Sequence, residues 1–379
     1  MEGKEQFSLI ISADSHVVEP PSLWTERLDR EYRDRAPHIF WDEERRGWFF
    51  GCDELTPALI NSLYAVDKSP EEFAEQQEVG IEAIRSGGND PGERLKDMER
   101  DGVAAEVLYT SLGMSLYWLK DAAFQKACFQ AYNNWLADFV SHAPNRLIGV
   151  GLVSLWDVDD AVRELHRCRA TGLKGVAIWA SPPEERAFTS LCNDPFWRAA
   201  QELEMPVSLH ILSGYQESPK LFDYNTSMER IQLNMAFPEE IQHSLTDIIF
   251  SGVLERFPNV KLVLAENDTG WVAYHLLHAD RIHVKLGPLL STSLMMTPSE
   301  YFKRQVYATF MEDEVGIVTI QLLGAKNFMW GSDYPHYEST WPKSQEVITQ
   351  SFLNTPEEDR VKVVYQNCAQ LYGLESSRS

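Results

Sequence analysis

The stretch that decides the fold is residues 147–180, LIGVGLVSLWDVDDAVRELHRCRATGLKGVAIWA. It begins with a short apolar run, Leu147–Ser154, and ends with another, Gly175–Ala180. Runs that are apolar throughout are typical of strands buried on both faces of a parallel sheet. Between them, Asp157–Ala170 predicts a helix, because acidic residues suit its first turn and Thr171-Gly172 is a C-cap signal. The stretch therefore predicts a strand–helix–strand unit.

The same alternation continues along the chain. It predicts eight strands: Phe7–Ala13, Val103–Thr110, Leu147–Ser154, Gly175–Ala180, Pro206–Ile211, Lys261–Glu266, Val306–Phe310 and Asn327–Gly331. The main predicted helices are Ala122–His142, Asp157–Ala170, Asn193–Leu203, Glu239–Phe257, Gly270–His283 and Asp313–Leu323. This pattern favours an α/β fold of the (β/α)8 TIM-barrel type. A doubly wound open sheet is the alternative, but no G-x-G-x-x-G motif follows the first predicted strand.

Two segments exceed what a minimal barrel needs. Val17–Gly102 separates the first two predicted strands, and we expect roughly residues 36–92 to be an insertion within a single domain that spans residues 1–379. Inside it, residues 39–50 (IFWDEERRGWFF) predict an aromatic hairpin. Leu212–Pro238 follows the fifth predicted strand. Both segments leave the carboxyl ends of strands, where barrel enzymes build their sites, so we expect lids or substrate walls rather than plain surface loops.

Charge and composition restrict the partners. The chain has 57 acidic and 34 basic side chains, a net charge of −23 with histidine neutral. This excess argues against nucleic acid and against an anionic membrane surface as partners. The 5 cysteines include no C-x-x-C pair, which is typical of reduced thiols in the cytoplasm. No run approaches the about 18 apolar residues of a membrane span, and the charged N-terminus does not resemble a signal peptide, so we expect a cytoplasmic protein.

Polar residues end three of the predicted strands. Asp14 and His16 follow the first strand and, two residues apart in an extended segment, point to the same side. His210 ends the fifth strand and Asp333 follows the eighth. Each alone would more often be a core histidine or a turn-capping aspartate. Because a barrel gathers the carboxyl ends of its strands at one mouth, we expect the four to converge. Two imidazoles and two carboxylates suit Zn²⁺, Mn²⁺ or Fe²⁺.

The sequence resembles the amidohydrolase superfamily in its amidohydrolase 2 branch, from Ile10 to about Leu374. That branch includes aminocarboxymuconate-semialdehyde decarboxylase, resorcylate-type decarboxylases and some hydrolases of ring-cleavage products. The motifs that carry the resemblance are DSHVVEPP (14–21), RLKDMERDGV (94–103), PSEYF (298–302) and GSDYPH (331–336). The resemblance implies a (β/α)8 barrel, one divalent metal and often a dimer or larger homo-oligomer. The metal ligands that it implies are Asp14, His16, His210 and Asp333.

One position departs from the branch. Its decarboxylases carry a catalytic histidine after the sixth strand, where this chain has Glu266. A carboxylate cannot act as an imidazolium does near neutral pH, but it can ligate a metal or accept a proton from water. The difference therefore favours hydrolysis. Together with His336 and Glu338, Glu266 would also add donor atoms near the first site, so binding of a second metal ion stays an alternative. The alternatives are a structural ion pair for Glu266, a turn residue for His336 and a solvated charge for Glu338.

We therefore predict a metal-dependent hydrolase in which metal-activated water attacks a carbonyl of an amide, ester, thioester or C–C bond. The candidate catalytic residues are Glu266, Asp333 and His336, with Glu266 as base or as ligand. The alternative is a nonoxidative decarboxylase or hydratase of an aromatic or enoic acid, and a barrel that binds metal without turnover is a third hypothesis. A serine nucleophile is not supported, because no G-x-S-x-G motif occurs.

The substrate is predicted from the aromatic residues of the expected walls. Trp48, Tyr109, Trp179, Tyr215 and Glu338 are the candidate substrate contacts, although any single aromatic residue is more often part of a core. We see no arginine cluster at the strand ends. Together with the acidic charge, this favours a bulky, mostly apolar or aromatic acid derivative over a small polyacid.

Overall fold

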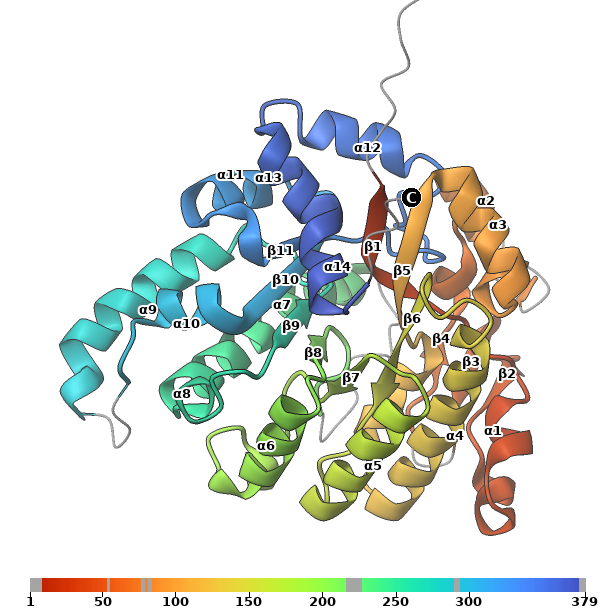
Figure 1. Cartoon of the computed structure of the whole chain (residues 1–379). Helices are drawn as coiled ribbons and strands as arrows, with labels where there is room; N and C mark the ends of the chain where they lie inside the picture. Colours follow the sequence, from red (N-terminus) through yellow and green to blue (C-terminus); the bar gives the residue numbers. More distant parts are fainter. Residues whose placement is uncertain are drawn as a thin grey trace, which may run out of the picture.

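The computed structural model describes residues 9–52, 55–75, 79–80, 84–215, 227–289 and 294–374. Eight parallel strands form one sheet, in which each strand is hydrogen-bonded to the next one along the chain that belongs to the sheet. They are β1 (Ile10–His16), β5 (Val103–Tyr109), β6 (Leu147–Leu152), β7 (Gly175–Ile178), β8 (Val207–His210), β9 (Leu262–Ala265), β10 (Val306–Phe310) and β11 (Phe328–Trp330). Every predicted strand is present, and Figure 1 shows the helices packed around the outside of the strands.

The first and last strands of this sheet are joined, which makes a nearly closed barrel. The backbone N–H of Asp333, three residues beyond β11, donates to the carbonyl of Asp14 in β1 at 2.9 Å. The N–H of His16 donates to the carbonyl of Tyr334 at 2.6 Å. The predicted (β/α)8 barrel is therefore confirmed, and the open-sheet alternative is wrong because an open sheet leaves its two edges apart.

Each helix predicted from the sequence is present, although its limits differ from the predicted ones. The helices are α1 (Leu23–Arg27), α2 (Pro70–Glu75), α3 (Pro91–Asp101), α4 (Ala122–Val140), α5 (Val158–Ala170), α6 (Asp194–Glu202), α7 (Ser227–Phe250), α8 (Val253–Arg256), α9 (Val272–Leu286), α10 (Pro298–Gln305), α11 (Glu314–Leu323), α12 (Ser344–Ser351), α13 (Glu357–Val361) and α14 (Asn367–Leu371). None of the helices in the described ranges is long and apolar enough to cross a membrane.

Two predicted limits were wrong for local reasons. The predicted helix Glu239–Phe257 begins earlier, at Ser227, and is divided into α7 and α8 by Gly252, whose φ of +77° interrupts helical geometry. The first strand extends to His16, because pairing with β5 resumes after an irregularity between Ser12 and Ser15. Asp14 and His16 therefore lie within β1 rather than after it.

The long segment between β1 and β5 contains the predicted aromatic hairpin. β2 (His38–Asp42) pairs antiparallel with β3 (Gly47–Gly51), and β4 (Ala58–Leu59), which the sequence did not predict, adds a third strand. The division into one domain with an insertion at residues 36–92 stays a prediction. In the other long segment, residues 216–226 lie outside the described residues.

A buried arginine fastens this segment to the barrel. Arg94 of α3 is fully buried, and its Nε donates to Glu106 Oε2 in β5 at 2.5 Å. Its Nη1 donates to the carbonyls of His16 at 2.8 Å and Gly87 at 3.1 Å. The guanidinium carbon lies 4.4 Å from the centre of the Tyr334 ring. One side chain thus joins α3, two strands and the segment that closes the barrel.

Replacing Arg94 by methionine should therefore destabilise the whole barrel. The change leaves the Glu106 carboxylate buried without its partner, which typically costs about 3–5 kcal/mol. Urea unfolding followed by circular dichroism measures the effect. The matched control is Lys96→Met on the exposed face of the same helix, which should leave the midpoint unchanged. Equal midpoints for the two variants would contradict this assignment.

Candidate metal centre

Two histidines point the same ring nitrogen toward the centre of the barrel mouth. His16 in β1 places Nδ1 2.8 Å from the carbonyl oxygen of Thr110, and His210 at the end of β8 places Nδ1 3.0 Å from the carbonyl of Ile211. A carbonyl only accepts hydrogen bonds, so both Nδ1 atoms carry the proton. Once the ring is in its neutral form, as metal binding requires, Nε2 presents a lone pair, and carbonyls that orient ligand imidazoles in this way are typical of metal sites.

Carboxylates surround these two nitrogens. Glu266 Oε2 lies 3.1 Å from His16 Nε2 and 3.2 Å from His210 Nε2. Asp14 Oδ1 lies 3.5 Å from His210 Nε2, and Asp333 Oδ1 lies 3.3 Å from His16 Nε2. Glu266 and Asp333 both have a φ of +55°, a region that non-glycine residues seldom adopt. This strained turn at the strand ends aims both carboxylates at the centre.

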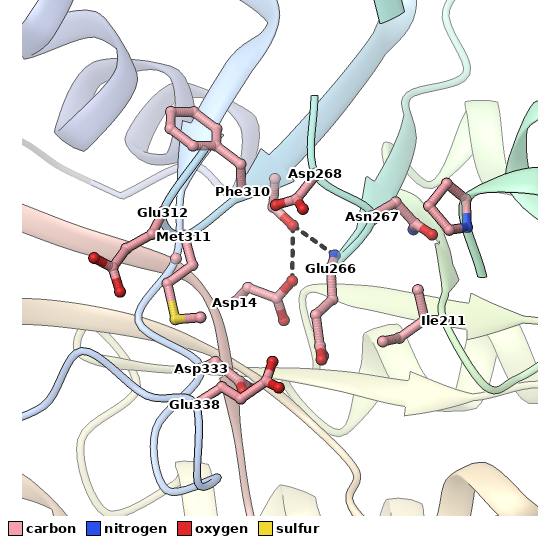
Figure 2. A pocket seen from close by; sticks show the side chains of 13 residues that line it. Asp14, Ile211, Glu266, Asn267, Asp268, Phe310, Met311, Glu312, Asp333 and Glu338 are labelled. Atoms are coloured by element: carbon pink, nitrogen blue, oxygen red, sulfur yellow. Dashed lines mark hydrogen bonds between the residues drawn. The ribbon is translucent and has the colours of Figure 1, made fainter. Parts of the chain in front are cut away.

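A threonine that the sequence analysis missed orders the carboxylates. Thr309 of β10 donates its hydroxyl to Asp14 Oδ2 at 2.7 Å and accepts from the backbone N–H of Glu266 at 2.8 Å (Figure 2). Asp14 Oδ1 is left buried without a hydrogen-bond partner. The signal in the sequence was a polar residue inside the apolar run Val306–Phe310. Thr309 thus selects the Asp14 oxygen that is available to a cation.

A second missed residue, Glu19, holds the strand end that orients His16. Its fully buried carboxylate accepts hydrogen bonds from the Leu112 N–H at 2.9 Å, the Gly113 N–H at 3.2 Å and the Thr110 hydroxyl. Burial raises the pKa of Glu19. Because the carbonyl of Thr110 fixes His16, Glu19 supports the centre from behind. Its signal was its position in the motif at residues 14–21.

The donor atoms form two overlapping groups. Within each group every donor atom lies within 4.8 Å of the others. The first group is Asp14, His16, His210 and Glu266, and the second is His16, Glu266, Asp333 and His336. All six belong to sites predicted from the sequence. Asp14 Oδ1, His210 Nε2 and Asp333 Oδ1 are buried polar atoms without hydrogen-bond partners, which fits a divalent cation, and the mixed N and O donors suit Zn²⁺, Mn²⁺ or Fe²⁺.

In the absence of a cation, burial and the neighbouring charges favour the protonated forms of two candidate ligands, His210 and Asp333. Burial alone would lower the pKa of His210, but Asp14 and Glu266 raise it to about 10. Burial, reinforced by the charge of Glu266, raises the pKa of Asp333 well above its usual range. Burial opposes ionisation of Glu266 too, but His16 and His210 hold its pKa well below normal. A cation that binds at this centre therefore displaces protons, so its affinity rises with pH.

The predicted substrate contacts do not all lie at the central cavity. Glu338 lines a cavity of about 240 Å³ at the centre (Figure 2). Tyr109 lies beneath the centre, with its ring 4.8 Å from that of His210 and its hydroxyl 3.0 Å from Ser208 Oγ. Trp179 is fully buried, and its ring centre lies 6.2 Å from that of Tyr215. Trp48 lines a separate surface hollow with the β2–β3 hairpin. The described lining of the central cavity does not include Tyr109, Trp179, Tyr215 or Trp48.

Nearly half of the residues that line this central cavity are acidic, and several of the others are apolar. Its acidic members are Asp14, Glu266, Asp268, Glu312, Asp333 and Glu338. Its other members are Ile211, Pro238, Asn267, Thr309, Phe310, Met311 and Gly331. Among the described lining residues none is basic, in line with the lack of an arginine clamp in the sequence. A bound anion would therefore depend on a cation at the donor groups for its countercharge.

Comparison with known proteins identifies the class. The profile of the amidohydrolase 2 family, described as "Amidohydrolase", matches residues 40–374, so the chain belongs to that family. The 2-amino-3-carboxymuconate-6-semialdehyde decarboxylase of Dictyostelium discoideum is 26% identical over 251 residues, which cover 65% of this chain and 67% of that protein. The gamma-resorcylate decarboxylase of a Polaromonas species is 22% identical, covering 74% and 86%.

Solved structures of similar fold cover nearly the whole chain. An amidohydrolase from Mycobacterium avium subsp. paratuberculosis superposes with a TM-score of 0.78 at 20% identity, over 96% of this chain and 99% of that one. The 5-carboxyvanillate decarboxylase of Novosphingobium aromaticivorans, solved with manganese and 4-hydroxy-3-methoxy-5-nitrobenzoic acid, gives 0.70 at 21% identity, over 98% of each chain. At these identities the likeness establishes the fold.

Removing His210 should remove bound metal. We expect His210→Ala, after loading with MnCl2 and desalting, to retain much less manganese than the parent protein, because Nε2 is one of the buried donors. Plasma mass spectrometry of metal per chain is the measurement. His278→Ala, an exposed imidazole on α9, is the matched control and should retain the parent's metal content. Equal retention by both variants would remove His210 from the ligand set.

Proposed function

We propose that the chain is a metal-dependent enzyme that removes a carboxyl group, without oxidation, from a small aromatic or enoic acid. The observation that carries this proposal is the setting of Asp333, a buried carboxyl with a raised pKa on the cavity wall beside the donor imidazoles. Such a group can hold the proton that must replace carbon dioxide on the substrate. The relatives named as decarboxylases support this activity over the hydrolysis that the sequence favoured.

The roles of the residues follow from their positions. Asp14, His16 and His210, which belong to one donor group, are the proposed ligands, and a cation held there would supply positive charge that offsets the substrate's anionic groups. As the C–C bond breaks, its electron pair remains on the substrate carbon, and Asp333 delivers a proton to that carbon. His336 acts through Asp333, because its Nδ1 lies 2.8 Å from Asp333 Oδ1.

The cavity limits the size of the substrate. Its volume of about 240 Å³ is below the roughly 300–1,000 Å³ of pockets for drug-sized ligands. A molecule with one ring is therefore favoured over the bulky substrate predicted from the sequence. Ile211, Phe310 and Met311 offer apolar contacts for the ring, and the acidic residues at the mouth disfavour additional negative charges.

Hydrolysis is the second candidate function, and Glu266 is the observation that favours it. Its carboxylate stands between the two imidazoles, and His16 and His210 hold its pKa well below normal, which keeps it ionised. An ionised carboxylate in this position could take a proton from an attacking water. The two candidates differ in what the product receives: hydrogen on carbon in decarboxylation, or oxygen from water in hydrolysis.

Isotopes separate the two reactions. The manganese-loaded protein should be incubated with 2,6-dihydroxybenzoate and with 5-carboxyvanillate, in D2O and separately in H2¹⁸O, and the products analysed by mass spectrometry. We expect release of carbon dioxide and one deuterium on the vacated carbon. Incorporation of ¹⁸O into an organic product would favour hydrolysis. Failure to convert any acid of one-ring size would sink the proposed activity.

If the reaction is hydrolysis, Glu266→Gln should keep the barrel folded and lower turnover by about 10²–10⁴-fold, because the amide cannot take a proton from the attacking water. Steady-state rates with the acid that the isotope experiment identifies as a substrate measure the effect, and circular dichroism checks the fold. The matched control is Glu312→Gln, an exposed carboxylate at the same cavity, which should retain turnover. Near-normal turnover in Glu266→Gln would make Glu266 structural.

A further inference from the structure

We propose that the central cavity binds an acid that also carries a protonated amine, and that Asn267 and Asp268 recognise this ammonium group. The inference rests on the proposed function and names the class of substrate that the same cavity takes. Both residues follow β9, and both belong to the lining of the cavity (Figure 2).

Asn267 presents a buried acceptor that lacks a donor. Its Nδ2 donates to the carbonyl of Ala265, and because a carbonyl only accepts, the amide cannot be reversed. Trp271 Nε1 donates to the backbone carbonyl of Asn267 at 2.8 Å, so the residue is held on two sides. Only 3% of Asn267 is exposed, and Oδ1 has no hydrogen-bond partner among the described residues. Such an acceptor costs free energy until a ligand donates to it.

The side chains of the described lining offer almost only acceptors. They include six carboxyl groups, and none of them belongs to lysine, arginine or histidine. The hydroxyl of Thr309 already donates to Asp14 Oδ2 at 2.7 Å. The proton that Asp333 holds is the one that the proposed reaction transfers. A polar substituent that enters this lining therefore forms hydrogen bonds with the remaining side chains by donating to them.

The charge of the lining makes an ammonium group the best donor. Asp268 is exposed next to Asn267, and Glu338 is an exposed carboxylate at the same cavity. A hydroxyl group would satisfy Asn267 Oδ1 but would leave these charges unmatched. An ammonium group has three donors and a positive charge, and its hydrogen bonds to carboxylates are charge-assisted.

An amino acid of this kind also suits the two ends of the cavity. Its carboxylate would lie toward Asp14, His16 and His210, where a cation would supply the countercharge. Its ammonium group would lie at Asn267 and Asp268. The molecule as a whole then has no net charge, so the acidic mouth does not repel it as it repels a simple anion.

Matched acids test the recognition without requiring turnover. The protein, incubated with MnCl2, should be titrated at pH 7 with the 3- and 4-isomers of aminomethylbenzoate, hydroxymethylbenzoate and methylbenzoate, and heats of binding recorded by calorimetry. The amine, like that of lysine, is protonated at this pH. In at least one series we expect the ammonium compound to bind about 10–100-fold more tightly than the methyl compound, and the hydroxymethyl compound about 2–10-fold more tightly.

Asp268→Asn separates the charge from the amide acceptor. Asparagine tolerates the φ of +48° at this position, so the turn should stay folded, and thermal unfolding checks this. The variant should lose most of the preference for the ammonium group and keep the preference for the hydroxymethyl group, which Asn267 accepts. The matched control is Glu312→Gln, which should keep both preferences, because the side chain of Glu312 extends away from Asp14 in Figure 2.

Equal binding of the ammonium and methyl compounds, or an ammonium preference that survives in Asp268→Asn, would overturn this inference, and so would the binding of none of the acids. Release of carbon dioxide from 2,6-dihydroxybenzoate tests the proposed function separately. An ammonium preference that Asp268→Asn abolishes, in a protein that decarboxylates no acid of one-ring size, would support the ammonium subsite and overturn the proposed activity.

Discussion

The proposed centre depends on the closure of the barrel between β1 and the segment that follows β11. The two backbone hydrogen bonds from Asp333 and His16 tie together residues from opposite ends of the chain. Gly331 permits this closeness, because a Cβ at that position would lie 2.5 Å from the Cβ of Asp14. Arg94 then secures the joint, since it bonds the His16 carbonyl and lies over Tyr334. Without closure, the two candidate donor groups would not exist.

Closure of the barrel also brings ionisable side chains together at a buried position. Three carboxylates and two imidazoles lie close together in the buried mouth, and each changes the pKa of its neighbours. Glu266 and Asp333 add left-handed backbone conformations that cost free energy. A cluster of buried like charges lowers the free energy of unfolding unless bound cations neutralise the carboxylates. The packing of the surrounding barrel, whose strands are buried, offsets the free energy that the site costs.

The sequence predicted the framework and most of the donors because both follow simple patterns. Apolar runs of strand length give the barrel, and a polar residue at the end of such a run, such as His210, is visible without a structure. The roles of Thr309 and Glu19 were not visible, because each acts through a contact between distant segments. Aromatic residues were the least informative. Trp179 is fully buried, and sequence alone does not separate a cavity wall from a core.

The acidic mouth of the cavity affects how metal reaches the centre. Asp268, Glu312 and Glu338 are exposed beside the buried donors, and no described residue of the lining is basic. A negative entrance raises the local concentration of cations and speeds their association, an effect that salt screens over about 10 Å at 0.1 M. The residues that disfavour anionic substrates would therefore also attract a metal cation toward the donor groups. We expect the rate of metal loading to depend on ionic strength as well as on the ligands themselves.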